Sequence, residues 1–197
     1  NGAPRSRRPE LARELAGLCE LPHFAAGYNV RLSEGQYGNA TLSRWPIEDV
    51  VIGLPGEPDP GQSRYIEALV TGDAGIVRVG GLYLPNGNPI GTEKFSYKLA
   101  WMEAFERHVR ELLKLEEPLV VAGDYNVIPT PMDAKRPDAW VNDALFQPQT
   151  RSAYQRLTGL GLTDAIRACH PGPGVYTFWD YQAGAWQKDD GIRIDHL

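Results

Sequence analysis

The segment PLVVAGDYNVIPTP, residues 118–131, places two polar side chains directly after an apolar run. Because residues i and i+2 of an extended chain point to the same side, Asp124 and Asn126 are expected to project together from the mouth of a buried strand. A carboxylate and an amide in that position can orient a water molecule and stabilise charge that develops on a phosphoryl oxygen. The alternative is a strand-end turn in which both side chains bond the local backbone.

Two other strand ends carry polar side chains. Tyr83, in GLYLPNG, precedes a Pro-Asn-Gly turn, where its hydroxyl can donate a hydrogen bond to a phosphate or position a nucleophile. Packing in a core or at its rim is the commoner role of a single tyrosine. In GIRIDHL, residues 191–197, alternation places Ile192 and Ile194 on one side and Asp195 on the other. An aspartate there either is solvated at an edge or pairs with an arginine, a metal or a histidine.

The segment YTFWDYQAGAW, residues 176–186, is dense in aromatic side chains. Such side chains can wall a pocket or stack on bases, but in isolation the segment favours a place in the core.

The elements that must position these residues are short strands and amphipathic helices. Helical spacing predicts a helix over residues 7–18, and residues 65–84 read as a hairpin that turns at TGDAG. Residues 92–117 predict a long helix with an apolar stripe that runs from Phe95 to Leu112, and a buried strand follows. Hairpins together with long helices predict an α/β (α+β) fold with sheets inside and helices outside.

The rest of the chain is more irregular. Residues 127–149 are rich in Pro, Asp and Asn, and we expect them to form a long surface loop that is too polar for the core. Two short helices broken at Gly159 and Gly161 should follow, and residues 191–197 should form a final strand.

Composition limits the class of protein. A chain of 197 residues that is 42 % hydrophobic and 23 % charged fits a single globular domain, residues 1–197. The formal net charge of -5 offers no global attraction for nucleic acid, so a polyanionic partner must be held by local basic residues or a cation. Two cysteines, Cys19 and Cys169, do not make a metal-ligand spacing and fit a reducing cytosol. No apolar run approaches the roughly 18 residues of a membrane span. We expect a cytoplasmic monomer without membrane contact.

Several segments follow one another in a distinctive order: G-x-x-G-N-A-x-L-S-R-x-P, G-x-Y-x-P-N-G, V-A-G-D-x-N-V-x-P-T, T-F-W-D-Y and G-x-R-I-D-H-L. From about residue 27 to the end, this order resembles the exonuclease III family of abasic-site endonucleases, which are DNA-repair nucleases of the endonuclease/exonuclease/phosphatase superfamily. The resemblance implies a four-layered α/β sandwich of two packed sheets with outer helices. It places the active site at one edge, where strand-end loops converge.

The resemblance also implies roles for single residues. Asp124 would activate or orient the attacking water, Asn126 would help to hold that geometry and the phosphate, and Tyr83 would contact the scissile phosphate. Asp195 would orient a catalytic histidine, and Arg64 would contact the DNA backbone. The remaining implied residues form a small apolar pocket for an extruded abasic sugar: Phe178, Ile192 and Ile194. Extrusion costs least where the base is already missing, which explains how a modest pocket can select abasic sites.

A bound cation follows from the same resemblance. The family uses Mg²⁺, with Mn²⁺ as the alternative, and Glu20 in GLCEL is the candidate metal ligand. The family's opening W-N-x-N-type strand and its closing S-D-H motif, which carries the catalytic histidine, do not stand in these residues. We therefore expect a domain that is incomplete at both ends and that has little or no nuclease activity as these 197 residues alone.

The leading hypothesis is a metal-dependent hydrolase of DNA phosphodiesters. It would act in base-excision repair on double-stranded DNA, incising at abasic sites and removing nucleotides or blocking groups from 3' ends. One alternative is a superfamily phosphodiesterase or phosphatase for lipid or sugar phosphates, and another is a catalytically inactive truncated domain. Nicking of an abasic duplex separates the first hypothesis from the last, and phosphorylated small molecules separate it from the second.

Overall fold

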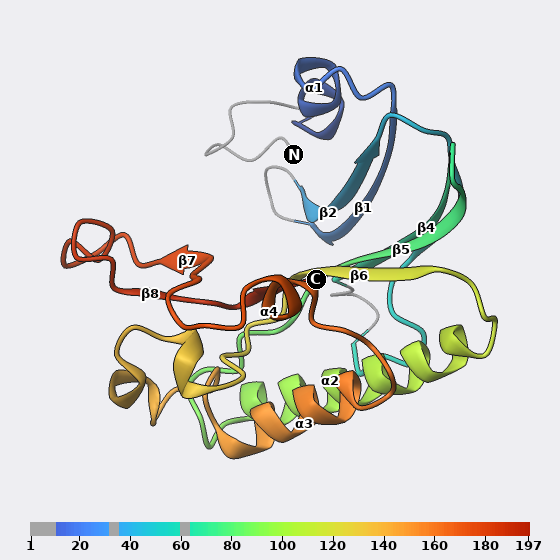
Figure 1. The fold of residues 1–197 in the computed structure, drawn as a ribbon. Helices are drawn as coiled ribbons and strands as arrows, with labels where there is room; N and C mark the ends of the chain where they lie inside the picture. Colours follow the sequence, from blue (N-terminus) through green and yellow to red (C-terminus); the bar gives the residue numbers. More distant parts are fainter. Residues whose placement is uncertain (1–10, 32–35, 60–63) are drawn as a thin grey trace. The chain divides into compact units, whose positions relative to one another are not determined.

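The computed structural model describes residues 11–31, 36–59 and 64–197. The chain forms two compact units (Figure 1). Unit 1 consists of Asn1–Tyr83 and Glu111–Ala122, and unit 2 consists of Leu84–Arg110 and Gly123–Leu197. The assignment of residues 1–197 to one domain stays a prediction.

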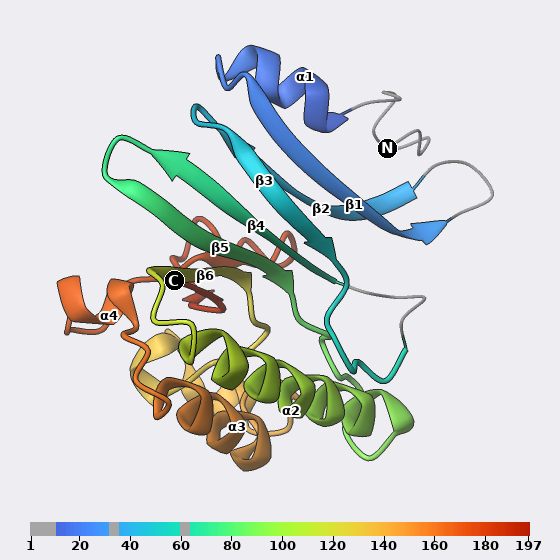
Figure 2. The ribbon, with the colours of Figure 1, turned by 90° about the vertical axis from the view of Figure 1, so that its right-hand side faces the viewer.

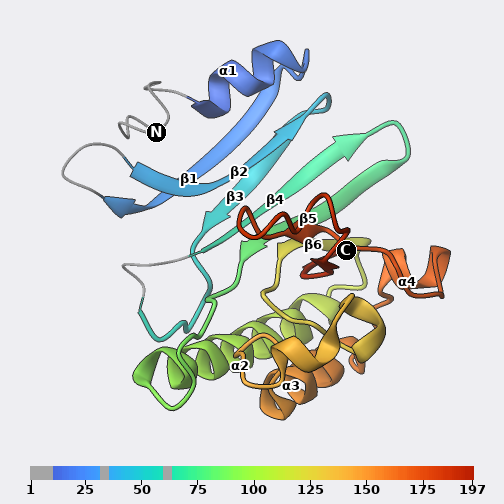
Figure 3. The ribbon, with the colours of Figure 1, turned by 90° about the vertical axis from the view of Figure 1, so that its left-hand side faces the viewer.

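Unit 1 is mainly β-structure. Its elements are α1 (Leu11–Leu18), β1 (His23–Arg31), β2 (Gln36–Ser43), β3 (Ile47–Ile52), β4 (Tyr65–Gly72), β5 (Gly75–Tyr83) and the start of β6 (Leu119–Asp124). Strands β1 and β2 form an antiparallel pair on which α1 packs (Figure 2, Figure 3). The other strands are ordered β3-β4-β5-β6 in a second sheet. The helix predicted over residues 7–18 is confirmed from Leu11 onwards, and residues 7–10 lie outside the described residues.

The predicted hairpin is confirmed as β4 and β5. Its register runs from Tyr65 opposite Leu82 to Gly72 opposite Gly75, so the turn holds only two residues. Gly75 has a φ of 113°, a backbone conformation that glycine adopts without the steric cost of a Cβ.

Unit 2 combines helices with short strands. Its elements are most of α2 (Glu93–Leu113), the end of β6, η2 (Pro131–Asp133), η3 (Pro137–Trp140), α3 (Pro148–Thr158), α4 (Ala165–Cys169), β7 (Phe178–Trp179), β8 (Gly191–Ile192) and β9 (Asp195–His196). The last residues of β6 pair with β9, and β7 pairs with β8, both antiparallel. The two short helices predicted around Gly159 and Gly161 are confirmed as α3 and α4.

Helix α2 contributes one apolar face to the core of unit 2. In the predicted stripe, Met102, Phe105 and Val109 are buried, which confirms the amphipathic pattern. Trp101 is buried as well and stacks on Phe105 with ring centroids 5.5 Å apart. Helix α3 lies beside α2 (Figure 1), where Arg156 pairs with Glu106 at 3.0 Å.

The prediction that residues 127–149 form a polar surface loop is wrong. The segment contains η2 and η3, and its apolar residues Ile128, Leu145 and Phe146 are buried. Its polar groups are satisfied locally, since Asp133 Oδ2 accepts hydrogen bonds from the backbone N–H and the hydroxyl of Thr130. Local hydrogen bonding frees the apolar side chains of an irregular segment to enter the core.

The prediction of one continuous final strand is also wrong, because residues 191–197 form β8 and β9 separately. Between them, the Arg193 N–H donates to the Asp133 carbonyl oxygen at 2.8 Å, and the Arg193 guanidinium donates from Nε to Asp133 Oδ1 at 2.7 Å. These bonds draw the chain toward η2 and interrupt the strand. Ile192 and Ile194 still point into one apolar cluster, as alternation predicts.

Candidate active site

Asp124 ends β6 and lies opposite Asp195 of β9 in the strand register. Its Oδ1 accepts a hydrogen bond of 2.8 Å from the backbone N–H of Asn126. The strand-end turn considered from the sequence is therefore present. It holds a carboxylate that remains partly accessible at the end of the strand.

The expectation that Asn126 projects beside Asp124 is wrong. Asn126 has a φ of 48°, so the chain is not extended there, and its side chain is only 4 % exposed. Its amide nitrogen donates to the Leu84 carbonyl oxygen at 2.8 Å, and its Oδ1 accepts from Asn86 Nδ2 at 3.2 Å. The buried side chain of Asn126 thus fixes the turn and keeps its N–H in place to hold Asp124 Oδ1.

The carboxyl group of Asp124 titrates close to neutrality. Burial raises its pKa from 3.8 to about 6, and the negative charge of Asp195 acts in the same direction. The N–H of Asn126 and the charge of Lys98 act in the opposite direction and favour the ionised form. A carboxylate with a pKa near 6 can accept a proton from water at physiological pH and release it again, which suits a general base.

A buried lysine that sequence reasoning missed lies under this turn. Lys98 of α2 is 0 % exposed, and its Nζ donates to the carbonyl oxygens of Pro85, Asn86 and Asn126. Burial lowers its pKa from 10.5 to about 7, while the charges of Asp124 and Asp143 act to raise it. The signal in the sequence is its spacing, because position 98 lies three residues after Phe95 and four before Met102, on the apolar side of the helix.

The Pro-Asn-Gly turn that follows β5 is tied to the rest of unit 2 by its asparagines. Asn88 Nδ2 donates to Asp143 Oδ1 at 3.0 Å, and Asn88 Oδ1 accepts from the N–H of Ala144 at 2.9 Å. The backbone N–H of Asn88 donates to Asn86 Oδ1 at 3.1 Å. Sequence reasoning recognised this turn but not the partners of its side chains.

Tyr83 and Arg64 come together within unit 1. The Arg64 guanidinium lies 5.0 Å from the centroid of the Tyr83 ring, and the Tyr83 N–H donates to the Arg64 carbonyl oxygen at 2.9 Å. Tyr83 is 45 % exposed, so its ring lies at a rim and not in a core. Glu20, also in unit 1, lies exposed just after α1 with a φ of 56°, and its role as a metal ligand stays a prediction.

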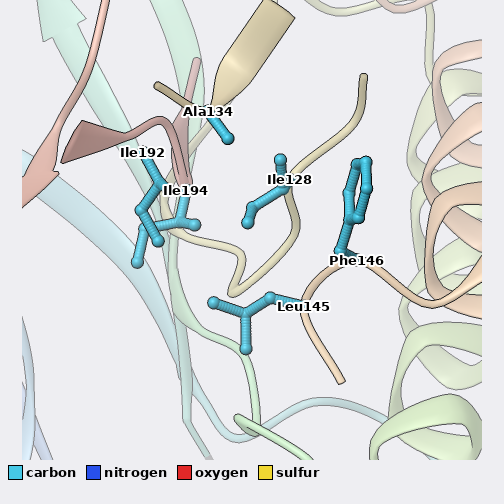
Figure 4. Packing of buried hydrophobic residues seen from close by; sticks show 6 residues of the cluster. All are labelled: Ile128, Ala134, Leu145, Phe146, Ile192 and Ile194. Carbon is cyan, nitrogen blue, oxygen red and sulfur yellow. The ribbon is translucent and has the colours of Figure 1, made fainter. Parts of the chain in front are cut away.

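The three residues expected to form an apolar pocket lie in one cluster of unit 2. Ile192 and Ile194 pack with four other buried residues (Figure 4): Ile128, Ala134, Leu145 and Phe146. Phe178 and Trp140 are partly buried against this cluster, and Phe178 pairs with Ile192 across β7 and β8. The structure therefore gathers Phe178, Ile192 and Ile194 at one place, with Phe178 on the accessible side.

The loop between β7 and β8 exposes aromatic side chains, so the core position favoured for the whole aromatic segment is wrong. Tyr181 is 99 % exposed and Trp186 is 67 % exposed. Trp186 packs edge to face on Trp179 with ring centroids 4.8 Å apart. The indole N–H of Trp179 donates to Asp189 Oδ1 at 3.2 Å. Exposed aromatic rings next to the strands of Phe178 and Ile192 form a surface on which flat apolar groups can stack.

His196 belongs to the core and not to a catalytic arrangement. Its side chain is buried, with Nδ1 2.9 Å from Arg193 Nη1 and Nε2 2.9 Å from the Val127 carbonyl oxygen. Since guanidinium can only donate and a carbonyl can only accept, the ring is the neutral tautomer with its proton on Nε2. Burial and the charge of Arg193 lower the pKa of His196 to about 4.

A buried ion network holds this histidine in place. Arg193, 1 % exposed, pairs with Asp133 at 2.7 Å and with Asp164 at 2.9 Å, and Arg167 also pairs with Asp133. Burial acts to raise the pKa of Asp133, but hydrogen bonds from Arg193 and Thr130 lower it overall. The network fixes the chain between β8 and β9, and hence the position of Asp195.

Among the described residues, no three His, Cys, Asp or Glu side chains are arranged so that they could hold a metal ion, and a complete metal site is therefore not formed by them. Asp124 and Asp195 fit part of one. They are hard oxygen donors of the kind that Mg²⁺ prefers, and the charge of Asp195 contributes to the raised pKa of Asp124. A cation nearby would relieve this repulsion.

Comparisons with known proteins bear on these observations. A family model described as Endonuclease/Exonuclease/phosphatase family matches residues 4–197. The chain is 32 % identical over 171 residues to an exodeoxyribonuclease of Bacillus subtilis, a match that covers 86 % of this chain and 66 % of that protein. The chain therefore spans slightly less than two thirds of the length of this relative.

Two solved structures are similar in fold. One is the 3' phosphatase NExo from Neisseria bound to a product DNA hairpin, with a TM-score of 0.81, 32 % identity and coverage of 99 % of this chain and 71 % of that one. The other is an AP endonuclease from Archaeoglobus fulgidus, with a TM-score of 0.81, 31 % identity and the same two coverages, 99 % and 71 %. The predicted α/β fold class and the resemblance seen in the motifs are confirmed, and the chain belongs to the Endonuclease/Exonuclease/phosphatase family.

Proposed function

We propose that the whole protein is a divalent-metal-dependent DNA phosphodiesterase of base-excision repair, which incises at abasic sites and removes nucleotides or blocking groups from 3' ends. The observation that carries this proposal is the carboxyl group of Asp124, whose pKa burial raises to about 6 at the end of β6. The apolar cluster with Phe178 at its accessible side belongs to the same unit.

In this proposal Asp124 accepts the proton of the water that attacks the phosphorus atom, while the bond from phosphorus to the 3' oxygen breaks and that oxygen takes a proton from solvent. The N–H of Asn126 holds Oδ1 of Asp124 in place, so the other carboxylate oxygen is available to the water. Asn126 acts through the buried bonds of its amide, which keep the turn rigid. Its role is to hold the geometry, and a direct contact with the phosphate is not part of the proposal.

Further residues bind the DNA. The Tyr83 hydroxyl contacts the scissile phosphate, and Arg64, whose guanidinium lies over the Tyr83 ring, contacts the backbone of the DNA. Glu20 is proposed to hold Mg²⁺, for which Mn²⁺ can substitute, and Asp195 is proposed to orient a catalytic histidine. When bound, the cation would neutralise part of the negative charge of the phosphate.

Selection of abasic sites rests on the apolar cluster. An extruded sugar without a base is small enough to be received beside Phe178, Ile192 and Ile194, whereas an intact nucleotide also requires unstacking of its base. Tyr181 and Trp186 are exposed and can stack on neighbouring bases. The similar structures named above, a 3' phosphatase bound to a DNA hairpin and an AP endonuclease, support both activities.

We further propose that the protein acts as a monomer in the cytoplasm. Among the helices of the described residues, none combines the length and the apolar character that crossing a membrane requires. Sedimentation of the whole protein, alone and with a short duplex, tests the proposed stoichiometry of one chain per DNA.

The test of the proposed function compares substrate classes. The whole protein is incubated with Mg²⁺ and, separately, with an abasic duplex, an intact duplex with a 3'-phosphate, and a set of phosphorylated sugars and lipid headgroups. We expect hydrolysis of the two DNA substrates and none of the small molecules. Faster turnover of a small phosphate monoester than of either DNA would support the lipid or sugar phosphatase instead.

A further inference from the structure

Lys98 has surroundings that packing alone does not require. Its Nζ donates to three backbone carbonyl oxygens, those of Asn126 at 2.6 Å, Asn86 at 3.1 Å and Pro85 at 3.2 Å. Within the described part of the chain, the hydrogen-bond partners of this ammonium group are these carbonyl oxygens, and none of them is a carboxylate. An ammonium that is fully buried without a paired anion is costly, so its place needs a reason beyond stability.

The carbonyls that Lys98 binds belong to the two segments that build the site. Pro85 and Asn86 lie in the turn that follows β5, and Asn126 lies directly after β6. The same Asn126 donates its N–H to Asp124 and its side-chain nitrogen to Leu84. The ammonium group therefore ties both segments to α2. Two hydrogen bonds through Asn126 connect it to the Asp124 carboxylate, one to the Asn126 carbonyl oxygen and one from the Asn126 N–H.

Sequence and packing keep a space for this side chain. A Cβ added to Gly87 would lie 2.6 Å from Lys98 Cδ and 3.3 Å from the Ala144 Cβ, so any larger residue there would displace the lysine stem. Gly87 also has a φ of 88°, which favours glycine independently. The turn after β5 is thus shaped to admit Lys98.

The charged groups that act on Lys98 are on other elements. Asp124 lies at the end of β6 and Asp143 lies before α3, and both favour the protonated ammonium, whereas burial opposes it and lowers the pKa of Lys98 to about 7. Reciprocally, the charge of Lys98 favours the ionised form of Asp124, against burial and the charge of Asp195. Lys98 thus acts on Asp124 both through hydrogen bonds and through charge.

We propose that Lys98 is a positioning residue for Asp124. Lys98 holds the turn of Asn126 through its carbonyl oxygen, and Asn126 in turn holds the Asp124 carboxylate. This inference rests on the proposed function for its catalytic consequence, but the positioning itself does not depend on DNA cleavage. Because Lys98 is 0 % exposed, its proposed role involves no contact with the DNA or the attacking water.

Three variants of the whole protein test the proposal. Lys98→Met keeps the length of the side chain but removes both the donors and the charge. Lys98→Gln keeps an N–H donor without the charge, and it also serves if the methionine variant does not fold. Lys94→Met is the matched control, since Lys94 lies one turn earlier on α2 and is exposed. Thermal unfolding shows which variants are folded before any other measurement.

The first readout is independent of activity. The backbone and side-chain amide resonances of Asn126 are recorded by NMR for each variant. In Lys98→Met we expect both resonances to shift, because the hydrogen bond to the Asn126 carbonyl oxygen is lost. Lys98→Gln should disturb them less, and Lys94→Met should change neither. Unchanged Asn126 resonances in a folded Lys98→Met protein would overturn the proposal, even if the wild type did not cleave DNA.

The second readout is incision of an abasic duplex. We expect Lys98→Met to lower kcat by about 10- to 100-fold with KM changed less than about twofold, since the variant displaces a catalytic group and leaves the DNA contacts intact. Trp101→Leu, a buried substitution on the same helix, controls for loss of stability. A loss of activity in Trp101→Leu equal to that in Lys98→Met, at equal stability, would show that Lys98 is only structural.

Discussion

Replacing Asp124 with Asn should abolish catalysis without weakening the fold, an unusual combination for a substitution at a largely buried site. The carboxylate is the proposed base, and removal of a general base typically lowers a rate 10²- to 10⁴-fold. In the activation barrier this corresponds to about 3–5 kcal/mol. The amide of Asn is similar in size, and its oxygen can still accept the N–H of Asn126.

The effect on stability follows from the raised pKa. Since the pKa of Asp124 rises from 3.8 to about 6 on folding, the folded state binds more protons, and the free energy of unfolding falls as the pH rises through that range. At pH 7 the ionised carboxylate then costs about 1–3 kcal/mol, allowing for its partial exposure. Asp124→Asn removes this cost, so we expect its free energy of unfolding at pH 7 to equal or exceed that of the wild type. As the pH rises from 4 to 6, the variant should lose less stability than the wild type.

The assay combines single-turnover incision of an abasic duplex with urea unfolding at pH 4, 5, 6 and 7. Asp138→Asn is the control, because Asp138 is an exposed aspartate in η3 of the same unit. Its substitution should change neither rate nor stability. A variant Asp124→Asn that is less stable by several kcal/mol, while its folded fraction cuts normally, would show that Asp124 is structural and that another group activates the water.

Other residues give predictions of different kinds. Phe178→Ala should reduce the preference for abasic over intact duplex by about tenfold, measured as the ratio of the two kcat/KM values, and should leave the metal requirement unchanged. Equal losses on both substrates would assign Phe178 to the core. Arg193→Met should lower the free energy of unfolding by about 3–5 kcal/mol in urea titrations, because it leaves the buried Asp133 carboxylate unpaired. Because the pKa of His196 falls from 6.5 to about 4 on folding, the unfolded state binds more protons, and stability should fall by roughly 3 kcal/mol as the pH drops through that window. His196→Phe should flatten this dependence, and a variant with an unchanged pH profile would contradict the assignment of a buried neutral ring.

Much of the local structure could be predicted from the sequence, because it depends on neighbouring residues. The alternation before and after TGDAG defined the β4–β5 hairpin, and the apolar stripe of α2 defined the longest helix. The motif order was enough to identify the family. It also named Asp195, which lies opposite Asp124, and the three residues that lie together at the apolar cluster: Phe178, Ile192 and Ile194.

Contacts between distant segments could not be predicted in the same way. Asn126 turns inward because Leu84 and Asn86, about forty residues earlier, offer partners to its amide. Residues 191–197 break into two strands because Arg193 meets Asp133, 60 residues earlier in the chain. The spacing of Lys98 places it on the apolar side of α2, but its partners, the carbonyl oxygens of Pro85, Asn86 and Asn126, lie in other segments and could not be predicted. In each case a polar partner far along the chain decided the outcome.

Incision of a labelled duplex that contains one abasic site tests the central claim most directly. The whole protein is assayed with Mg²⁺, with a chelator, and on a matched duplex in which the base is present. The account predicts a single cut at the abasic position that requires the metal and is at least tenfold slower on the intact duplex. No cut at the abasic position with either Mg²⁺ or Mn²⁺, from a folded protein, would contradict it.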